Sequence, residues 1–195
     1  MMIWKRAAPL AVLVLLSGCI APVGPIQVTR FHAPDIAALS HGTISVEAAP
    51  GADAGSLELK SYQSAVAQQL QRIGYSEGGA GDSVALVKLA RSRSEPQRSS
   101  GPVSVGLGGS TGSFGSGVGL GIGINLSGPP PEQVETQLSV SIRERAGGKV
   151  LWEGRATFTV SAKSPLASTS LAAPKMAEAL FRGFPGNSGE TIEVK

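Results

Sequence analysis

Alternation of apolar and polar residues over 134–160 constrains the fold of this chain more than any other feature. The apolar row comprises Val134, Leu138, Val140 and Ile142, with Thr136 among them, and then Val150, Trp152, Ala156, Phe158 and Val160. The intervening Ala-Gly-Gly at 146–148 suits a turn. Because successive side chains point to opposite faces of a strand, the pattern predicts an antiparallel hairpin with one buried and one hydrated face. Gly154 interrupts the row and predicts a bulge or a close contact.

Residues 56–73 show the clearest helical periodicity. Apolar residues recur there at every third or fourth position, and they are Leu59, Tyr62, Val66, Leu70 and Ile73. Ser56 suits the N-cap position, and Gly74 suits the end of the helix.

A second helix is predicted over 168–183. Its apolar stripe consists of Leu171, Met176, Leu180 and Phe184. Pro174 is expected in or near the first turn, and Gly183 at the end. Shorter strand-like segments are 25–31, 42–47, 82–90 and, as an edge strand, 191–194. Two helix stripes and one apolar sheet face bury each other in a two-layer α+β sandwich, so we predict a single domain over 26–195, with a mainly antiparallel sheet and both helices on one face.

The glycine-rich segment 101–128 invites a nucleotide-binding interpretation, which its spacing excludes. No three glycines in it have the GxGxxG spacing; Gly115 and Gly117, for example, would need a third glycine where Leu120 stands. A Walker A loop requires Gly-Lys-Ser/Thr, and the segment contains no lysine. We therefore expect no phosphate-binding loop and no nucleotide cofactor.

Two apolar rows predict that 101–128 is instead a glycine-backed β-hairpin. The rows are Val103, Val105 and Leu107, and then Val118, Leu120, Ile122, Ile124 and Leu126, with 108–116 as the loop. Glycine weakens a strand through backbone entropy and missing packing, so the apolar rows need a surface to dock on. That surface is either the protein's own core or sheet edge, or else an envelope protein, a second copy or the membrane.

Residues 1–18 have the three parts of a signal peptide. Lys5 and Arg6 supply the positive charge, an apolar run follows, and small residues precede Cys19. The apolar run is shorter than the roughly 20 residues that span a bilayer. Leu16-Ser17-Gly18-Cys19 resembles the lipobox of bacterial lipoproteins, which implies cleavage between Gly18 and Cys19 and attachment of palmitate-type acyl chains to Cys19.

Lipidation would make the membrane a partner through the acyl chains on Cys19, with 19–25 as the tether. Cys19 is the only cysteine, so an intrachain disulfide is impossible. Ile20 follows it, which is compatible with sorting to the outer membrane. We expect a location in the bacterial envelope, at the outer membrane and facing the periplasm.

The net charge gives no case for nucleic acid as a partner. The formal charge of +3 falls to +1 when the signal peptide and its two basic residues are removed. A local basic run comprises Lys88, Arg91, Arg93 and Arg98. It suits either a surface that meets anionic headgroups or peptidoglycan, or a solvated strand end.

Residues for catalysis or metal binding are sparse. His32 and His41 are the only histidines, and we expect both in loops or at strand ends. No GxSxG motif occurs. Trp152-Glu153-Gly154-Arg155 could offer an aromatic face to a sugar, but Trp152 is in phase with the buried row and is predicted to be core. We therefore expect no catalytic, cofactor-binding or metal-binding residue.

In their order along the chain, several landmarks resemble the domain-of-unknown-function-4136 family of bacterial lipoproteins. They are Phe31-His32, the helix ending in Ile73-Gly74-Tyr75, Asp82 at a strand start, the glycine-rich middle, Trp152-Glu153-Gly154 with Ala156, and Phe184-Pro185-Gly186. The resemblance covers nearly the whole mature chain. It implies an envelope location and this type of fold, and it supplies no established reaction and no catalytic residues.

Three functional hypotheses follow. The leading one is a lipid-anchored, non-enzymatic protein that binds or scaffolds another envelope component. The alternative is an auxiliary lipoprotein of a transport or outer-membrane assembly system, presenting a sheet edge to its partner. The third, a cell-wall or glycan hydrolase, requires a cleft with two carboxylates about 5 to 9.5 Å apart.

Overall fold

The computed structural model describes residues 23–34, 39, 42–79, 81–94, 103–112, 115–124 and 131–195, with 103–112 and 115–124 described by their backbone alone. Across these residues, seven strands form one sheet in the order β3-β2-β4-β7-β8-β1-β9. The strands are β1 (Ile26–His32), β2 (Thr43–Ala48), β3 (Ser76–Glu77), β4 (Ser83–Ser94), β7 (Gln133–Glu144), β8 (Val150–Ser161) and β9 (Thr191–Val194). The helices are α1 (Leu57–Arg72) and α2 (Thr169–Phe181), with a 3-10 turn, η1, at Pro165–Ala167.

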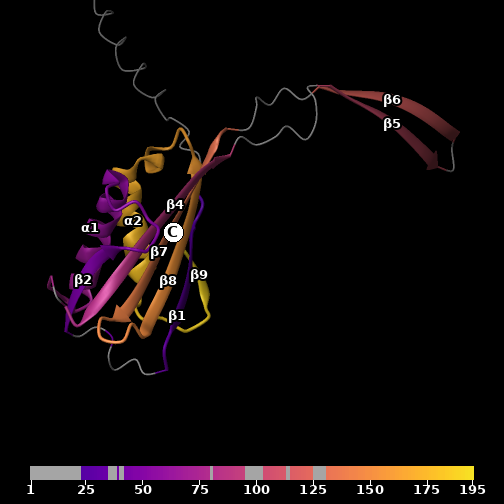
Figure 1. The fold of residues 1–195 in the computed structure, drawn as a ribbon. Coiled ribbons are helices and arrows are strands. Elements are labelled where there is room, and N and C mark those ends of the chain that lie inside the picture. Colours follow the sequence, from indigo (N-terminus) through magenta and orange to yellow (C-terminus); the bar gives the residue numbers. More distant parts are fainter. Residues whose placement is uncertain are drawn as a thin grey trace, which may run out of the picture.

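The predicted α+β architecture is confirmed. β2 runs parallel to β3 and β4, and the other neighbouring strands in the sheet pair antiparallel. Figure 1 shows α1 and α2 side by side on one side of the sheet. Neither described helix lies over the other face of the sheet, and the outward side chains of its central strands are partly or fully exposed.

The β7–β8 hairpin has the predicted inward row, with one correction. Val150, expected to be buried, is 38% exposed, whereas its neighbour Leu151 is 1% exposed. The register explains the exchange, because Ile142 pairs with Trp152 while the next residue, Arg143, pairs with Val150. Leu151 is thus the extra residue of a β-bulge, and the alternation shifts by one position there.

Of the two alternatives predicted for Gly154, the structure shows the close contact, whereas the β-bulge of this strand lies at Leu151. The Trp152 ring is fully buried and stacks on Phe181, with centroids 5.3 Å apart. A Cβ on Gly154 would lie 2.2 Å from the Trp152 ring and 2.8 Å from Leu180 of α2. Trp152 is therefore core, as its phase predicted, and glycine at 154 leaves room for the indole beneath α2.

The first helix follows its sequence signals. The Ser56 hydroxyl accepts a hydrogen bond from the Leu59 backbone N–H at 3.2 Å, which satisfies one of the free donors of the first turn. Gly74 follows the helix with φ of 110°, a conformation that favours glycine. The predicted stripe is buried against the sheet at Leu59, Tyr62, Val66 and Leu70, with Ile73 partly buried beside it.

The second helix differs from the prediction in two respects. It begins at Thr169 after the N-cap Ser168, so Pro174 lies in its second turn, where the missing N–H removes one hydrogen bond of the helix. Leu171, placed in the buried stripe, is 48% exposed, and alanines of α2 make much of the contact instead. Phe184 lies beyond the end of the helix and packs on Trp152, 5.2 Å between centroids.

The glycine-rich segment contains β5 (Val103–Gly112) and β6 (Gly115–Ile124), which form a separate two-stranded antiparallel sheet. Both strands extend into the segment predicted as a loop, because the register continues to Gly112 and Gly115. Its apolar rows are register partners: Val103 pairs with Ile124, Val105 with Ile122 and Leu107 with Leu120. What covers these rows stays a prediction, since their side chains are outside the described part of the chain.

Candidate functional site

The uncovered face of the main sheet carries the candidate site. The register aligns Lys88 of β4, Ser139 of β7 and Arg155 of β8 in one row across the strands. Thr29 of β1 follows in the same row. The neighbouring row consists of Leu86, Ser141, Glu153 and Phe31. Because neighbouring strands lie about 4.8 Å apart, Lys88 and Arg155 flank Ser139 from backbones about 10 Å apart.

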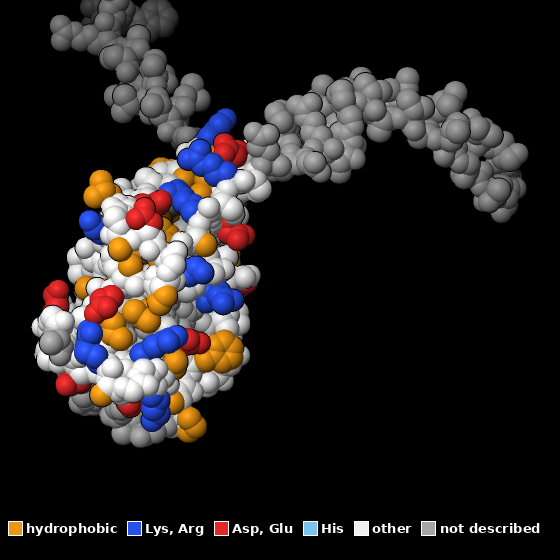
Figure 2. All heavy atoms as spheres, in the orientation of Figure 1, with side chains coloured by type: hydrophobic (Ala, Val, Ile, Leu, Met, Phe, Trp, Pro, Cys, Tyr) orange, Lys and Arg blue, Asp and Glu red, His pale blue; other side chains and the backbone are white. Residues whose placement is uncertain are grey.

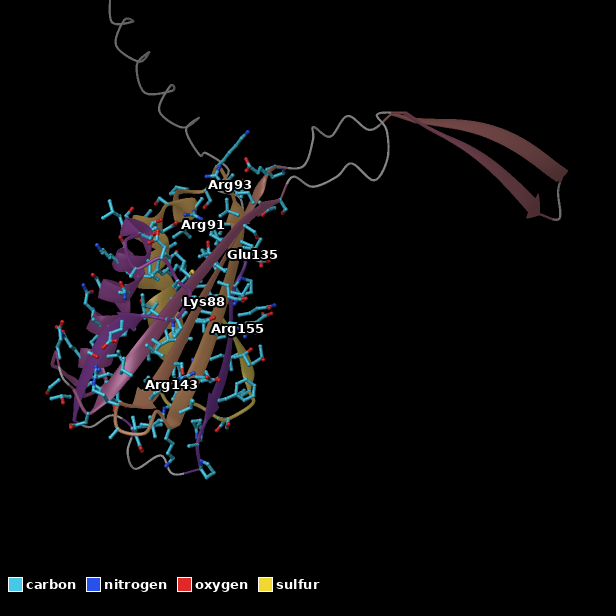
Figure 3. The ribbon with its side chains drawn as sticks, viewed as in Figure 1. Lys88, Arg91, Arg93, Glu135, Arg143 and Arg155 are labelled. Carbon is cyan, nitrogen blue, oxygen red and sulfur yellow. The ribbon has the colours of Figure 1, made fainter. Side chains whose placement is uncertain are left out.

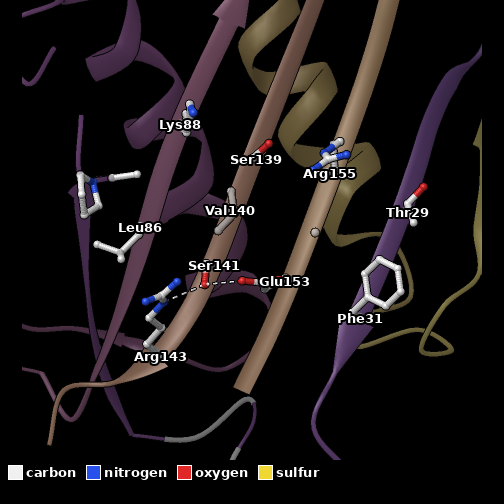
Figure 4. A pocket seen from close by; sticks show the side chains of 13 residues that line it. Thr29, Phe31, Leu86, Lys88, Ser139, Val140, Ser141, Arg143, Glu153 and Arg155 are labelled. Carbon is white, nitrogen blue, oxygen red and sulfur yellow. Dashed lines mark hydrogen bonds between the residues drawn. The ribbon is translucent and has the colours of Figure 1, made fainter. Parts of the chain in front are cut away.

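A groove with a volume of about 440 Å³ follows these two rows (Figure 4). Its floor is low where β7, the strand in the middle, carries the short side chains of Ser139 and Ser141 on this face. Apolar side chains border it at Leu86 and Pro50, and at the half-exposed Phe31 on β1. The groove therefore combines a hydroxyl-bearing floor, an aromatic edge and several cations.

One half of the groove has its charges already paired. Arg143 Nε donates to Ser141 Oγ at 3.1 Å, and Ser141 Oγ donates to Glu153 Oε1 at 3.3 Å (Figure 4). The hydroxyl thus links the cation to the carboxylate. Glu153 is the one acidic residue among the described residues that line the groove.

The other half has cations without a counter-charge. Within the described part of the chain, neither Lys88 nor Arg155 forms an ion pair or a side-chain hydrogen bond. Both side chains are exposed, and both are labelled with Arg143 along this face in Figure 3. In the space-filling view, Lys and Arg side chains are spread over the same face among hydrophobic ones (Figure 2). Two unpaired cations beside a hydroxyl floor suit a carboxylate or phosphate group.

The basic run predicted from the sequence does not form one patch. Arg91 lies on the helix-covered face, where it donates to Glu58 Oε1 at 2.6 Å and to the Ala167 carbonyl. Arg93 lies at the end of β4, 4.0 Å from a Glu132 carboxylate oxygen. Of the described members of the run, Lys88 faces the groove. Successive side chains of β4 point to opposite faces of the sheet, so Arg91 and Arg93, at odd positions, lie on the other side from Lys88.

Two other charged clusters have structural roles. Arg30 is 4% exposed on the helix side of β1 and donates to the Ala179 carbonyl at 3.2 Å, near the end of α2. Burial lowers the pKa of Arg30, although nearby Glu190 opposes the shift. At the edge of the open face, Arg145 Nη2 donates to Glu47 Oε1 at 2.8 Å, and this hydrogen bond lowers the pKa of Glu47.

Several residues singled out in the sequence lie outside the described residues: Gly18, Cys19, His41, Arg98 and Leu126. Val118, Leu120, Ile122 and Ile124 are in β6. His32 ends β1, and its Nδ1 lies 2.8 Å from the Ala33 carbonyl oxygen. Sequence reasoning missed that Lys88 and Arg155 lie on either side of Ser139, because strands that are distant in sequence bring them together.

The described residues include no group of three or more His, Cys, Asp or Glu side chains suited to hold a metal ion. No helix among those described has the length and apolar character needed to cross a membrane.

Comparison of the sequence with known proteins identifies a matching family and a partial relative. A family model described as "Domain of unknown function (DUF4136)" matches residues 40–186. An uncharacterised protein of Zymomonas mobilis is 36% identical over 63 residues, which span 32% of this chain and 24% of that relative's length.

The solved structures that align with this chain share little of its sequence. A PDZ domain protein from Parabacteroides distasonis aligns with a TM-score of 0.50 at 11% identity, over 88% of this chain and 39% of that chain. A PelC dodecamer from Paraburkholderia phytofirmans aligns with a TM-score of 0.42 at 15% identity, over 84% of this chain and 99% of that chain.

Proposed function

Because the chain belongs to the DUF4136 family, whose description assigns no activity, we propose a function from its own residues: a lipid-anchored, non-enzymatic binding protein of the bacterial envelope. Its binding surface is the open face of the sheet, and its ligand is an envelope component that carries carboxylate or phosphate groups. The observation that carries this proposal is the row Lys88–Ser139–Arg155, in which two cations without counter-charges flank a hydroxyl.

The composition of the groove supports binding rather than hydrolysis. A glycan hydrolase needs a second carboxylate opposite the first. The described lining contains Glu153, which already accepts a hydrogen bond from Ser141. The half-exposed Phe31 gives the groove an apolar edge on which the body of a ligand can rest while its anionic group meets the cations.

Titration of the folded domain with an acidic oligosaccharide tests the binding role, with a neutral oligosaccharide of the same length as the reference. We expect Lys88→Ala with Arg155→Ala to weaken binding of the acidic oligomer by about 100-fold or more, since each of the two charge-assisted hydrogen bonds contributes about 1.5–3 kcal/mol. The matched control is Arg93→Ala with Lys163→Ala, which removes the same charge from exposed positions outside the groove. Equal losses in the two double variants, or no preference for the acidic oligomer, would contradict the proposal.

The anchor is tested through its covalent chemistry. Cells that express the full chain should incorporate labelled palmitate into it, and globomycin should cause the unprocessed precursor to accumulate. Cys19→Ala should abolish both the label and the processing before residue 19. Palmitate labelling that persists in Cys19→Ala would overturn the lipid anchor while leaving the groove proposal intact.

A further inference from the structure

The glycine-rich hairpin leaves the domain at the end where the N-terminal tether enters it. Ser94, the last residue of β4, pairs with Gln133, the first residue of β7, and Gln133 pairs with Ser161 of β8. Gly24 of the tether lies beside this end of β8, since a Cβ on it would be 3.9 Å from the Thr159 carbonyl oxygen. One end of the sheet therefore holds both the tether and the base of the hairpin.

Chain length limits how far this end can be from an anchored Cys19. Cys19 and Gly24 are five positions apart in the sequence, so the chain between them spans at most about 18 Å when fully extended. Ser94 and Val103 are nine positions apart, so the chain between them spans at most about 32 Å. An acyl anchor on Cys19 would therefore hold the membrane within reach of β5 and β6.

The composition of the hairpin segment fits a lipid surface. No charged residue occurs between Arg98 and Glu132. In one row of the register, the apolar residues Val103, Val105 and Leu107 of β5 have apolar partners on β6. In the other row, Ser104 pairs with Gly123 and Gly106 with Gly121. One apolar row and one row of glycine and serine match the boundary between acyl chains and headgroups.

The hairpin also needs such a surface. An isolated two-stranded hairpin is at best marginally stable in water, and glycine makes it weaker. β5 and β6 pair only with each other in the sheet topology of the described residues. The exposed Lys163 stands at the same end of the domain, where it would meet anionic headgroups, while Arg93 at this end lies 4.0 Å from a Glu132 carboxylate oxygen.

From these observations we propose that the β5–β6 hairpin is a membrane-contact element whose apolar row rests in the lipid surface beside the acyl anchor. The identity of the membrane rests on the proposed anchor, whereas the affinity of the hairpin for lipid does not. The domain is thus held at the membrane by two attachments that leave from the same end of the sheet.

The test uses the chain from residue 19 onward with Cys19→Ala, so that no acyl chain contributes, and vesicles of phosphatidylethanolamine and phosphatidylglycerol. The parent should float with the vesicles in about 1 M salt, where the Debye length is about 3 Å and groove cations contribute little. Val105→Asp should lower the bound fraction by about tenfold or more, because it places a charge in the apolar row. Ser104→Asp, the neighbouring position in the other row, adds the same charge and should stay within about twofold of the parent.

Each other outcome overturns the proposal. Equal binding by parent and Val105→Asp, equal loss in both variants, or loss of all binding in high salt would exclude the apolar row as a lipid contact. A Val105→Asp variant that loses self-association in light scattering but still floats like the parent would identify a second copy as the occupant. The unfolding midpoint of the main domain should be the same in all three proteins, which excludes misfolding as the cause.

Discussion

At the scale of single residues, the Ser141 hydroxyl links two opposite charges on the open face and leaves Lys88 and Arg155 outside that link. Ser141 accepts from Arg143 and donates to Glu153, so these two charges compensate each other through it. Ser139, two residues earlier, has no carboxylate in its row of strand partners, and Lys88 and Arg155 on either side of it form no ion pair in the described part of the chain. In the proposed binding role, ligand preference is therefore set by the pattern of carboxylates as much as by the number of cations.

A second polar contact on this face predicts a pH effect. Arg145→Ala should raise the pKa of Glu47 toward the ordinary value of about 4.3, since the Arg145 hydrogen bond is the main cause of its lowered pKa. A carboxyl with a lowered folded pKa adds stability above its unfolded pKa and loses it as pH falls through the folded pKa. The stability advantage of the parent over Arg145→Ala should hence shrink below about pH 4.

NMR titration of the Glu47 carboxyl and urea unfolding at several pH values measure these effects. The stability difference should be small, because the Arg145 and Glu47 side chains are 39% and 48% exposed. Lys149→Ala is the control, since Lys149 Nζ is 3.9 Å from Glu144 and does not contact Glu47. A Glu47 pKa that is the same with and without Arg145 would show that the hydrogen bond is not maintained in solution.

At the scale of elements, the contact between β8 and α2 depends on the absence of one side chain. The Trp152 ring crosses over Gly154 and fills the space that a Cβ would need, and Leu180 of α2 closes the same space. The ring also donates from Nε1 to the Pro185 carbonyl at 3.0 Å. The indole thus joins β8, the end of α2 and the segment that follows it.

Gly154→Ala should therefore destabilise the fold by about 1–3 kcal/mol, the usual range for overpacking a close-packed core. The new Cβ would lie 2.2 Å from the Trp152 ring, which has to move away from α2. Gly79→Ala is the matched control, because nothing lies within 4 Å of a Cβ there. Urea unfolding followed by Trp fluorescence measures both, and equal stabilities would show that the indole has another place to go.

Sequence reasoning succeeded for elements whose signal is local. The alternation over β7 and β8, the Ser56 cap and the arrangement of two helices on one sheet face were predicted and are confirmed. It failed at Val150, where a β-bulge shifts the alternation, and at Leu171, which is exposed while alanines of α2 are buried instead. The groove was beyond local patterns, because the outward residues of β4, β7 and β8 meet only once the strand order is known.

At the scale of the whole molecule, the described chain consists of a sandwich and a two-stranded sheet inserted between β4 and β7. β4 and β7 pair along their full lengths, up to Ser94 and Gln133, without any contribution from β5 or β6. Among the residues whose side chains are described, the core cluster consists of residues of the sandwich. The sandwich should therefore be a complete folding unit without the glycine-rich segment.

Deletion of residues 101–128 should leave the unfolding free energy of the sandwich unchanged within about 0.5 kcal/mol, as expected for changes away from the core. Circular dichroism and urea unfolding of the deleted and parent proteins, both from residue 19 onward with Cys19→Ala, provide the comparison. A loss of several kcal/mol would show that the apolar rows dock on the sandwich itself. That result would also restore the protein's own core as the surface that the sequence left open.

The pairing of Ser94 with Gln133 has a consequence for how this protein can vary. Two chain ends that a β-ladder already holds together can be joined by a segment of almost any length, because each doubling of a loop adds only about 0.6 kcal/mol of closure entropy. The position after Ser94 is thus an insertion site: a segment inserted there can be longer, shorter or different in sequence while the domain keeps its fold. A fluorescent or affinity insert placed there should therefore leave the fold of the sandwich unchanged and would label the end of the sheet at which β4 ends and β7 begins.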